Sequence, residues 1–353
     1  MTNGLSGPRK QFLDVLRVLA TCAVVLMHVL TGAIDVTDTS IVPEYRSLLL
    51  SVMDLVTWCV PIFLLISGYL FLNPERTLTY PVMVKKYCRR IALAILLFGV
   101  PYAASELVVA EKSFRVMMIP EALKMTLTGH TWSHMWYLYL ILFLYLITPL
   151  LKKVLRVLPV WGVAAVMAVI FLGSSVAPFL NKVLDVNSIP VLPDGGVYFL
   201  YYLCGYFFAV REVCVDKGRN VWLTAAVAVL ALGMILSRTL AGFSIQMAYN
   251  YPFTVLLAVL LFAAGWKGGR DGADSTAREK DRTHRIPWQE AGALSFAVYL
   301  VHPVYVNLLY KFVKITPFTV LEQCGVQSVA AGQAVLILLL AAFCLVVLAL
   351  ATA

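Results

Sequence analysis

The chain has 353 residues, of which 61% are hydrophobic and only 13% are charged, and it carries a formal net charge of +9. A soluble domain averages about 25% charged residues, so this composition excludes a soluble globule, whose surface it cannot cover. The apolar residues form unbroken runs, such as 91–100 and 334–351, rather than the apolar/polar alternation of a membrane β-barrel. The sequence therefore predicts an all-α fold, a polytopic bundle of transmembrane helices.

Apolar stretches of about 20 residues, the length that crosses a bilayer, predict about ten transmembrane helices in a single membrane domain over residues 1–353. The first helix is expected to be retained, because Asp14 and Arg17 lie where a cleaved signal peptide has its uncharged apolar core. The predicted spans, in chain order, are residues 12–34, 48–72, 83–105, 134–151, 160–180, 195–211, 221–241, 247–266, 291–310 and 330–351.

Lysine and arginine predict the orientation, since both are enriched in cytoplasmic loops. With the N-terminus in the cytoplasm, most of the 28 lysines and arginines fall in cytoplasmic segments. This places both termini inside, in a multi-pass protein of the plasma or inner membrane, and explains the positive charge without a nucleic-acid partner. Residues 267–290 are expected to be a flexible cytoplasmic loop, and residues 106–133 a surface loop or a short helix over the outer mouth.

The first predicted helix carries three ionisable residues, Asp14, Arg17 and His28. At about 100° per residue, Arg17 and His28 differ by only about 20°, so the three side chains share one face, with the Arg17 and His28 backbones roughly 16 Å apart. Such a polar stripe is expected to line the bundle interior or a watery cavity. Two structural alternatives remain: Arg17 reaches the inner headgroups with Asp14 as its ion-pair partner, and His28 makes an interhelical hydrogen bond without chemistry.

A basic cluster lies at the cytoplasmic entry of the third span. It is either a positive-inside signal or a site for an anionic cytoplasmic ligand, because lysine and arginine bind phosphates well. The residues of this cluster are Lys85, Lys86, Arg89 and Arg90.

The remaining histidines and the cysteines give weaker indications. His130 and His134 stand four residues apart, but no third ligand accompanies them, so no metal site is predicted. His302 falls within the ninth predicted span, where a hydrogen-bonded packing histidine is the simplest interpretation. The seven cysteines are scattered without a Cys-x-x-Cys pair and are interpreted as small buried side chains.

Four motifs in order resemble those of the integral-membrane acyltransferase 3 family, and the chain is similar also to the membrane half of membrane-bound serine racemases. Arg17 followed by His28 matches the family's arginine-x10-histidine signature, and Ser67-Gly68 ends its second-helix motif. On the third helix, Lys86 and Arg89 stand where the family usually has two arginines. The other two motifs are His134-x-Trp136-Tyr137-Leu138 and the run Ser295 to Pro303, which contains His302.

The resemblance implies transfer of an acyl group, usually acetyl, from cytoplasmic acetyl-CoA or another acyl-CoA to a hydroxyl of an envelope or exported glycan or lipid-linked saccharide. No metal cofactor is implied. His28 is then the expected general base, since histidine is the commonest such group. The other expected site residues are Asp14 and Arg17 on the same helix face, Lys86, Arg89 and Arg90 toward CoA, and Ser67, His134, Trp136 and His302 toward the substrate.

A transporter is the alternative function. The stripe of Asp14, Arg17 and His28 would then be a path for an unmodified small solute, such as an amino acid, and CoA would play no part. The sequence defines neither the acceptor nor the oligomeric state.

Overall fold

The computed structural model describes residues 11–37, 42–210, 225–234, 247–268, 288–326 and 328–352. No strand occurs among these residues, so the predicted all-α fold is confirmed. Within the described ranges, seven helices are long and apolar enough to cross a membrane, and three shorter apolar helices, Gly195–Val210, Ala225–Met234 and Pro252–Gly265, coincide with the sixth to eighth predicted spans. The count of ten and the cytoplasmic termini therefore stay predictions, and most of the predicted 267–290 loop lies outside the described residues.

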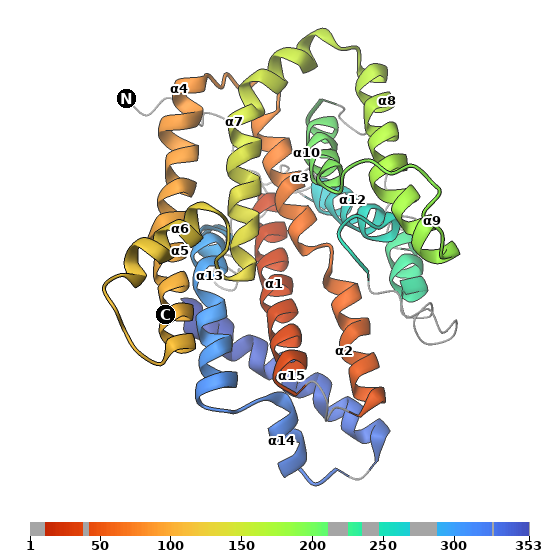
Figure 1. Cartoon of the computed structure of the whole chain (residues 1–353). Coiled ribbons are helices and arrows are strands. Elements are labelled where there is room, and N and C mark those ends of the chain that lie inside the picture. The colour runs from red at the N-terminus through yellow and green to blue at the C-terminus, as the bar shows by residue number, and fades with distance from the viewer. Residues whose placement is uncertain are drawn as a thin grey trace, which may run out of the picture. The chain divides into compact units, whose positions relative to one another are not determined.

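Several of the seven long helices combine two or three consecutive elements (Figure 1). In chain order the elements are α1 (Gln11–Thr37), α2 (Pro43–Val56), α3 (Cys59–Phe71), α4 (Tyr80–Val82), η1 (Met83–Cys88), α5 (Arg89–Glu111), α6 (Met118–Leu127), η2 (Ser133–Met135), α7 (Trp136–Val157), α8 (Val160–Phe171), η3 (Leu172–Val176), α9 (Ala177–Leu184), α10 (Gly195–Val210), α12 (Pro252–Gly268), α13 (Trp288–Asn307), η6 (Leu308–Phe312), α14 (Pro317–Gln323) and α15 (Val329–Thr352).

The chain forms two compact units, each described by itself. The first unit comprises residues 1–66, 169–204 and 212–353, and the second comprises residues 67–168 and 205–211.

Helix α1 is at the centre of the first unit. It packs most extensively on α13 and also contacts α2, α12 and α15, as Figure 1 shows for the neighbouring ribbons of α1, α13 and α15. A helix enclosed on several sides can carry polar side chains away from lipid. Its buried apolar residues form one core cluster with residues of the partner helices, among them Val29, Leu30, Val298, Val306, Leu336 and Leu340.

The second unit packs α5 against α6 and α7. Of the two alternatives for residues 106–133, the short helix is correct at residues 118–127, where α6 buries Met118, Ala122 and Thr126. A Cβ at Gly99 of α5 would lie 2.7 Å from Thr126 Cγ2, so the missing side chain of Gly99 lets α6 approach α5 closely.

Candidate functional site

Asp14 and Arg17 of α1 form an ion pair one turn apart. Arg17 Nη1 donates to Asp14 Oδ1 at 2.8 Å, and the side chains of Arg17 and Asp14 are 26% and 3% exposed. The buried carboxylate is therefore neutralised by a guanidinium that keeps part of its own surface accessible. The ion pair that was one alternative for Arg17 is formed, and the exposed part of the guanidinium can still bind an anion.

Helix α13 passes very close to this ion pair. A Cβ on Gly292 would lie 3.0 Å from both Asp14 Cβ and Asp14 Oδ1, and 3.3 Å from Asp14 Cα. Glycine at this position allows the two helices to approach closely, as small residues do at helix contacts in membranes.

His28 is anchored to its own helix through one ring nitrogen. Its Nδ1 lies 2.9 Å from the carbonyl oxygen of Val24. A carbonyl oxygen only accepts hydrogen bonds, so Nδ1 carries the hydrogen and, in the neutral ring, Nε2 carries the lone pair. His28 is half-buried. It therefore has the tautomer that a general base acting through Nε2 requires, and part of the residue is exposed.

The structure brings His302 of α13 against His28. The two ring centroids are 4.8 Å apart and the ring planes cross at 73°, in an edge-to-face contact. His302 Nδ1 lies 3.0 Å from the carbonyl oxygen of Val298, and the residue is 0% exposed. Two histidines that the sequence places in separate motifs thus form one pair.

Three tyrosine hydroxyls surround this part of the first unit, and no sequence motif singles them out. Tyr249 donates to Met27 Sδ at 3.4 Å, and Tyr310 donates to the carbonyl of Val29 at 3.2 Å, so hydroxyls reach the residues on both sides of His28. Tyr201 in turn donates to the carbonyl of Tyr249 at 2.7 Å.

Asp54 is a buried carboxylate of the first unit that the sequence analysis also missed. It is 1% exposed, and its Oδ1 accepts a hydrogen bond from the backbone N–H of Met247 at 2.9 Å. This bond fixes the start of the segment that presents Tyr249. The residue lies in α2, far from Met247 in the chain, and only the folded structure shows the bond.

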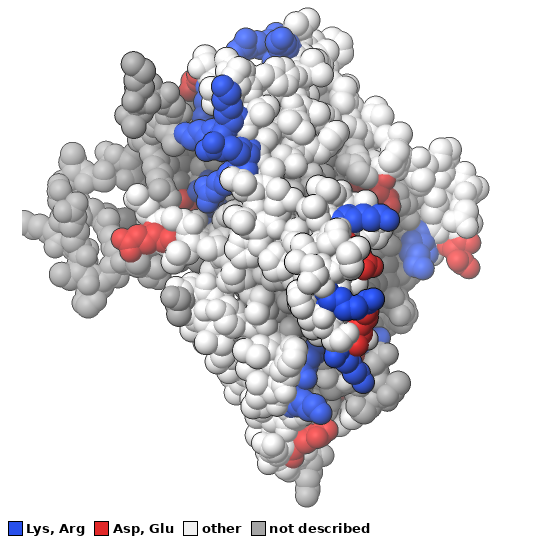
Figure 2. All heavy atoms as spheres, turned by 60° about the vertical axis from the view of Figure 1, so that its left-hand side comes forward, with Lys and Arg blue, Asp and Glu red and all other residues white. Residues whose placement is uncertain are grey.

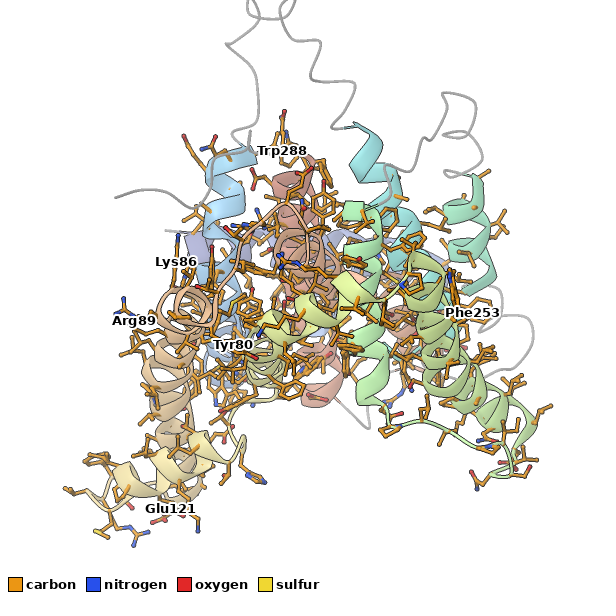
Figure 3. The ribbon with its side chains drawn as sticks, turned by 90° about the horizontal axis from the view of Figure 1, so that it is seen from above. Tyr80, Lys86, Arg89, Glu121, Phe253 and Trp288 are labelled. Carbon is orange, nitrogen blue, oxygen red and sulfur yellow. The ribbon has the colours of Figure 1, made fainter. Side chains whose placement is uncertain are left out.

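The predicted basic cluster lies on the surface of the second unit. Lysine and arginine side chains gather in a blue patch in Figure 2, and Lys86 and Arg89 lie on the outer side of their helical segment in Figure 3. Exposed cations at these positions are compatible both with a positive-inside signal and with a site for an anionic ligand. All four residues of the cluster, Lys85, Lys86, Arg89 and Arg90, are exposed.

Lys152 is a buried cation of the second unit that the sequence analysis counted only as a loop charge. Its Nζ donates to the carbonyl oxygens of Asn73 at 2.5 Å and of Arg76 at 2.7 Å. Arg76 Nη1 donates to the carbonyl of Leu70 at 3.0 Å, and its guanidinium lies 5.4 Å from the centroid of the Phe71 ring. Arg76 therefore satisfies a carbonyl oxygen at the C-terminal end of α3, and Lys152 binds two carbonyl oxygens of the turn that follows this helix.

The other predicted substrate residues also belong to the second unit. Ser67 of α3 and His134 of η2 are 8% and 4% exposed. The His134 ring centroid lies 5.7 Å from that of Tyr102, which stacks on Trp132 at 4.2 Å. Trp136 begins α7. Contact of Ser67, His134 and Trp136 with a substrate stays a prediction.

A family model described as an acyltransferase domain matches residues 10–353. No curated protein and no solved structure matches the chain. The family match covers nearly the whole chain, and the long apolar helices agree with a membrane location. The chain therefore belongs to the acyltransferase 3 family and is a multi-pass membrane acyltransferase.

Proposed function

We propose that the protein transfers an acyl group, acetyl in the first instance, from cytoplasmic acyl-CoA to a hydroxyl of an envelope or exported glycan or lipid-linked saccharide. The observation that carries this proposal is the state of His28, whose Nδ1 is bonded to the carbonyl of Val24 while the residue as a whole is only partly buried. A base with this geometry is what an attacking hydroxyl needs, because an alcohol is a poor nucleophile until its proton is removed.

In the proposed reaction, the acceptor oxygen attacks the thioester carbonyl carbon, the C–O bond forms and the C–S bond breaks. His28 Nε2 takes the hydroxyl proton as the bond forms and passes it to the departing CoA thiolate, so the ring ends neutral. General base catalysis of this kind contributes about 10²–10⁴-fold to the rate.

The cations have separate roles in this proposal. Asp14 fixes Arg17, and the accessible part of the Arg17 guanidinium orients the thioester or a CoA phosphate. Lys86, Arg89 and Arg90 are exposed and attract the same anion from the cytoplasm, where both termini then lie. Ser67, His134 and Trp136 are the expected acceptor contacts, and the protein is expected in the plasma or inner membrane.

The test uses the purified protein in liposomes, with acetyl-CoA on the side of the basic cluster and an envelope extract as acceptor. Release of CoA is followed with a thiol reagent, and the acylated acceptor is followed with labelled acetyl-CoA. His28→Gln is expected to lower kcat by about 10²–10⁴-fold. His130→Gln is the matched control, because His130 is an exposed histidine of the second unit.

Normal acyl transfer by a folded and inserted His28→Gln protein would falsify the base role. Flux of an unmodified solute, without CoA release, would instead favour the transporter.

A further inference from the structure

His28 and His302 make the same kind of backbone hydrogen bond, and they lie on two helices that run in the same direction. Along α1, residues 14, 28 and 32 meet residues 292, 302 and 306 of α13 in ascending order. Each histidine binds the carbonyl four residues before it through Nδ1. In both neutral rings the lone pair is therefore on Nε2, at the ring edge farthest from the ring's own backbone attachment.

The two rings differ in access. His302 is 0% exposed, whereas His28 is half-buried. Only His28 can therefore meet a substrate atom in this structure, and any chemical contribution of His302 has to act through His28. Two imidazolium rings in contact repel each other, so the pair holds one extra proton at a time.

We propose that His302 is a positioning residue for His28. The edge-to-face contact holds the His28 ring plane, and the lone pair on His302 Nε2 stabilises the imidazolium that forms when His28 takes the acceptor proton. His302 keeps its own hydrogen on Nδ1 throughout, shared with Val298, and the proton taken by His28 leaves with the CoA thiolate. This inference rests on the function proposed above, but its chemical claim concerns the reactivity of His28 alone.

Simple packing is the competing explanation, and His302→Phe separates the two. Phenylalanine preserves an aromatic ring of similar size and removes both nitrogens. Loss of one such electrostatic interaction is expected to lower kcat by about tenfold, with KM for acetyl-CoA unchanged. A packing role predicts wild-type kcat for His302→Phe and a loss only for His302→Ala.

Asn307→Ala is the matched control. Asn307 lies on the same helix and donates from Nδ2 to the carbonyl of Pro303 at 3.0 Å, so it makes the same kind of bond four residues back. This variant is expected to keep wild-type kcat and KM.

A second measurement does not depend on acyl transfer to a natural acceptor. Diethyl pyrocarbonate acylates neutral histidine: Nε2 attacks a carbonyl carbon, the N–C bond forms, ethyl carbonate leaves and decays to ethanol and carbon dioxide, and the Nδ1 proton passes to water. Positive charge develops on the ring during the attack. The rate at His28, followed by peptide mass spectrometry, is expected to fall by about tenfold in His302→Phe, while exposed His130 reacts at an unchanged rate.

The outcomes distinguish the two proposals. Slower modification of His28 in His302→Phe, without acyl transfer by the wild type, supports the histidine pair and contradicts the proposed function. Equal His28 modification rates in wild type and His302→Phe, or an unchanged kcat in an active protein, overturn the role of His302.

Discussion

Arg17 Nη1 lies 2.8 Å from Asp14 Oδ1, and only the carboxylate of this pair is fully enclosed. Removing the Arg17 guanidinium would leave the buried Asp14 carboxylate charged, whereas removing both charges would not. The effects of the two substitutions on the free energy of unfolding are therefore expected to be coupled.

Arg17→Met is expected to destabilise the protein by about 1–3 kcal/mol, because it removes the guanidinium that donates to the buried Asp14 carboxylate. Adding Asp14→Asn to that variant is expected to restore most of the loss. Thermal unfolding in detergent, arranged as a double-mutant cycle, measures the coupling. Strictly additive effects would show that the pair contributes nothing.

Gly292→Ala is expected to lower both Tm and acyl transfer. A methyl group at this position would lie 3.0 Å from Asp14 Cβ and Oδ1, so α13 has to move away from the ion pair. A shift of several degrees in Tm is expected. Gly233→Ala is the control, since a Cβ there meets no atom within 4 Å. Equal behaviour of the two variants would contradict a tight contact at Gly292.

Lys152→Met is expected to destabilise the protein by about 1–3 kcal/mol, because the carbonyl oxygens of Asn73 and Arg76 lose a charged donor. Lys153→Met, at the exposed neighbouring position, is expected to stay within about 0.5 kcal/mol of wild type. Thermal unfolding in detergent gives both values. A similar loss in the two variants would mean that the loss of a positive charge, and not of the hydrogen bonds to Asn73 and Arg76, is responsible.

Lys86→Gln combined with Arg89→Gln is expected to raise KM for acetyl-CoA by about fivefold, with little change in kcat, because exposed cations attract the donor without touching the reacting atoms. The effect is expected to shrink as salt is raised. Lys124→Gln, an exposed cation of α6, serves as the control. An unchanged KM at low salt would restrict the cluster to a role at the lipid headgroups.

Properties that depend on one helix were predictable from the sequence. The all-α fold follows from unbroken apolar runs, because a chain in lipid satisfies its backbone hydrogen bonds within helices. The Asp14–Arg17 pair follows from a spacing of three residues, and the shared face with His28 follows from the helical repeat. Four short motifs and their order indicated the acyltransferase 3 family, and the match of the family model over residues 10–353 confirms it.

Properties that depend on which helices meet were decided only by the tertiary structure. His302 is the partner of His28, and Gly292 lies against Asp14, because α13 packs along α1; no local periodicity specifies that choice. The same holds for Lys152, which is buried while Lys153 is exposed. A hydropathy scale gives two adjacent lysines the same value. Their exposure differs only when packing buries one face of the helix and leaves the other face open.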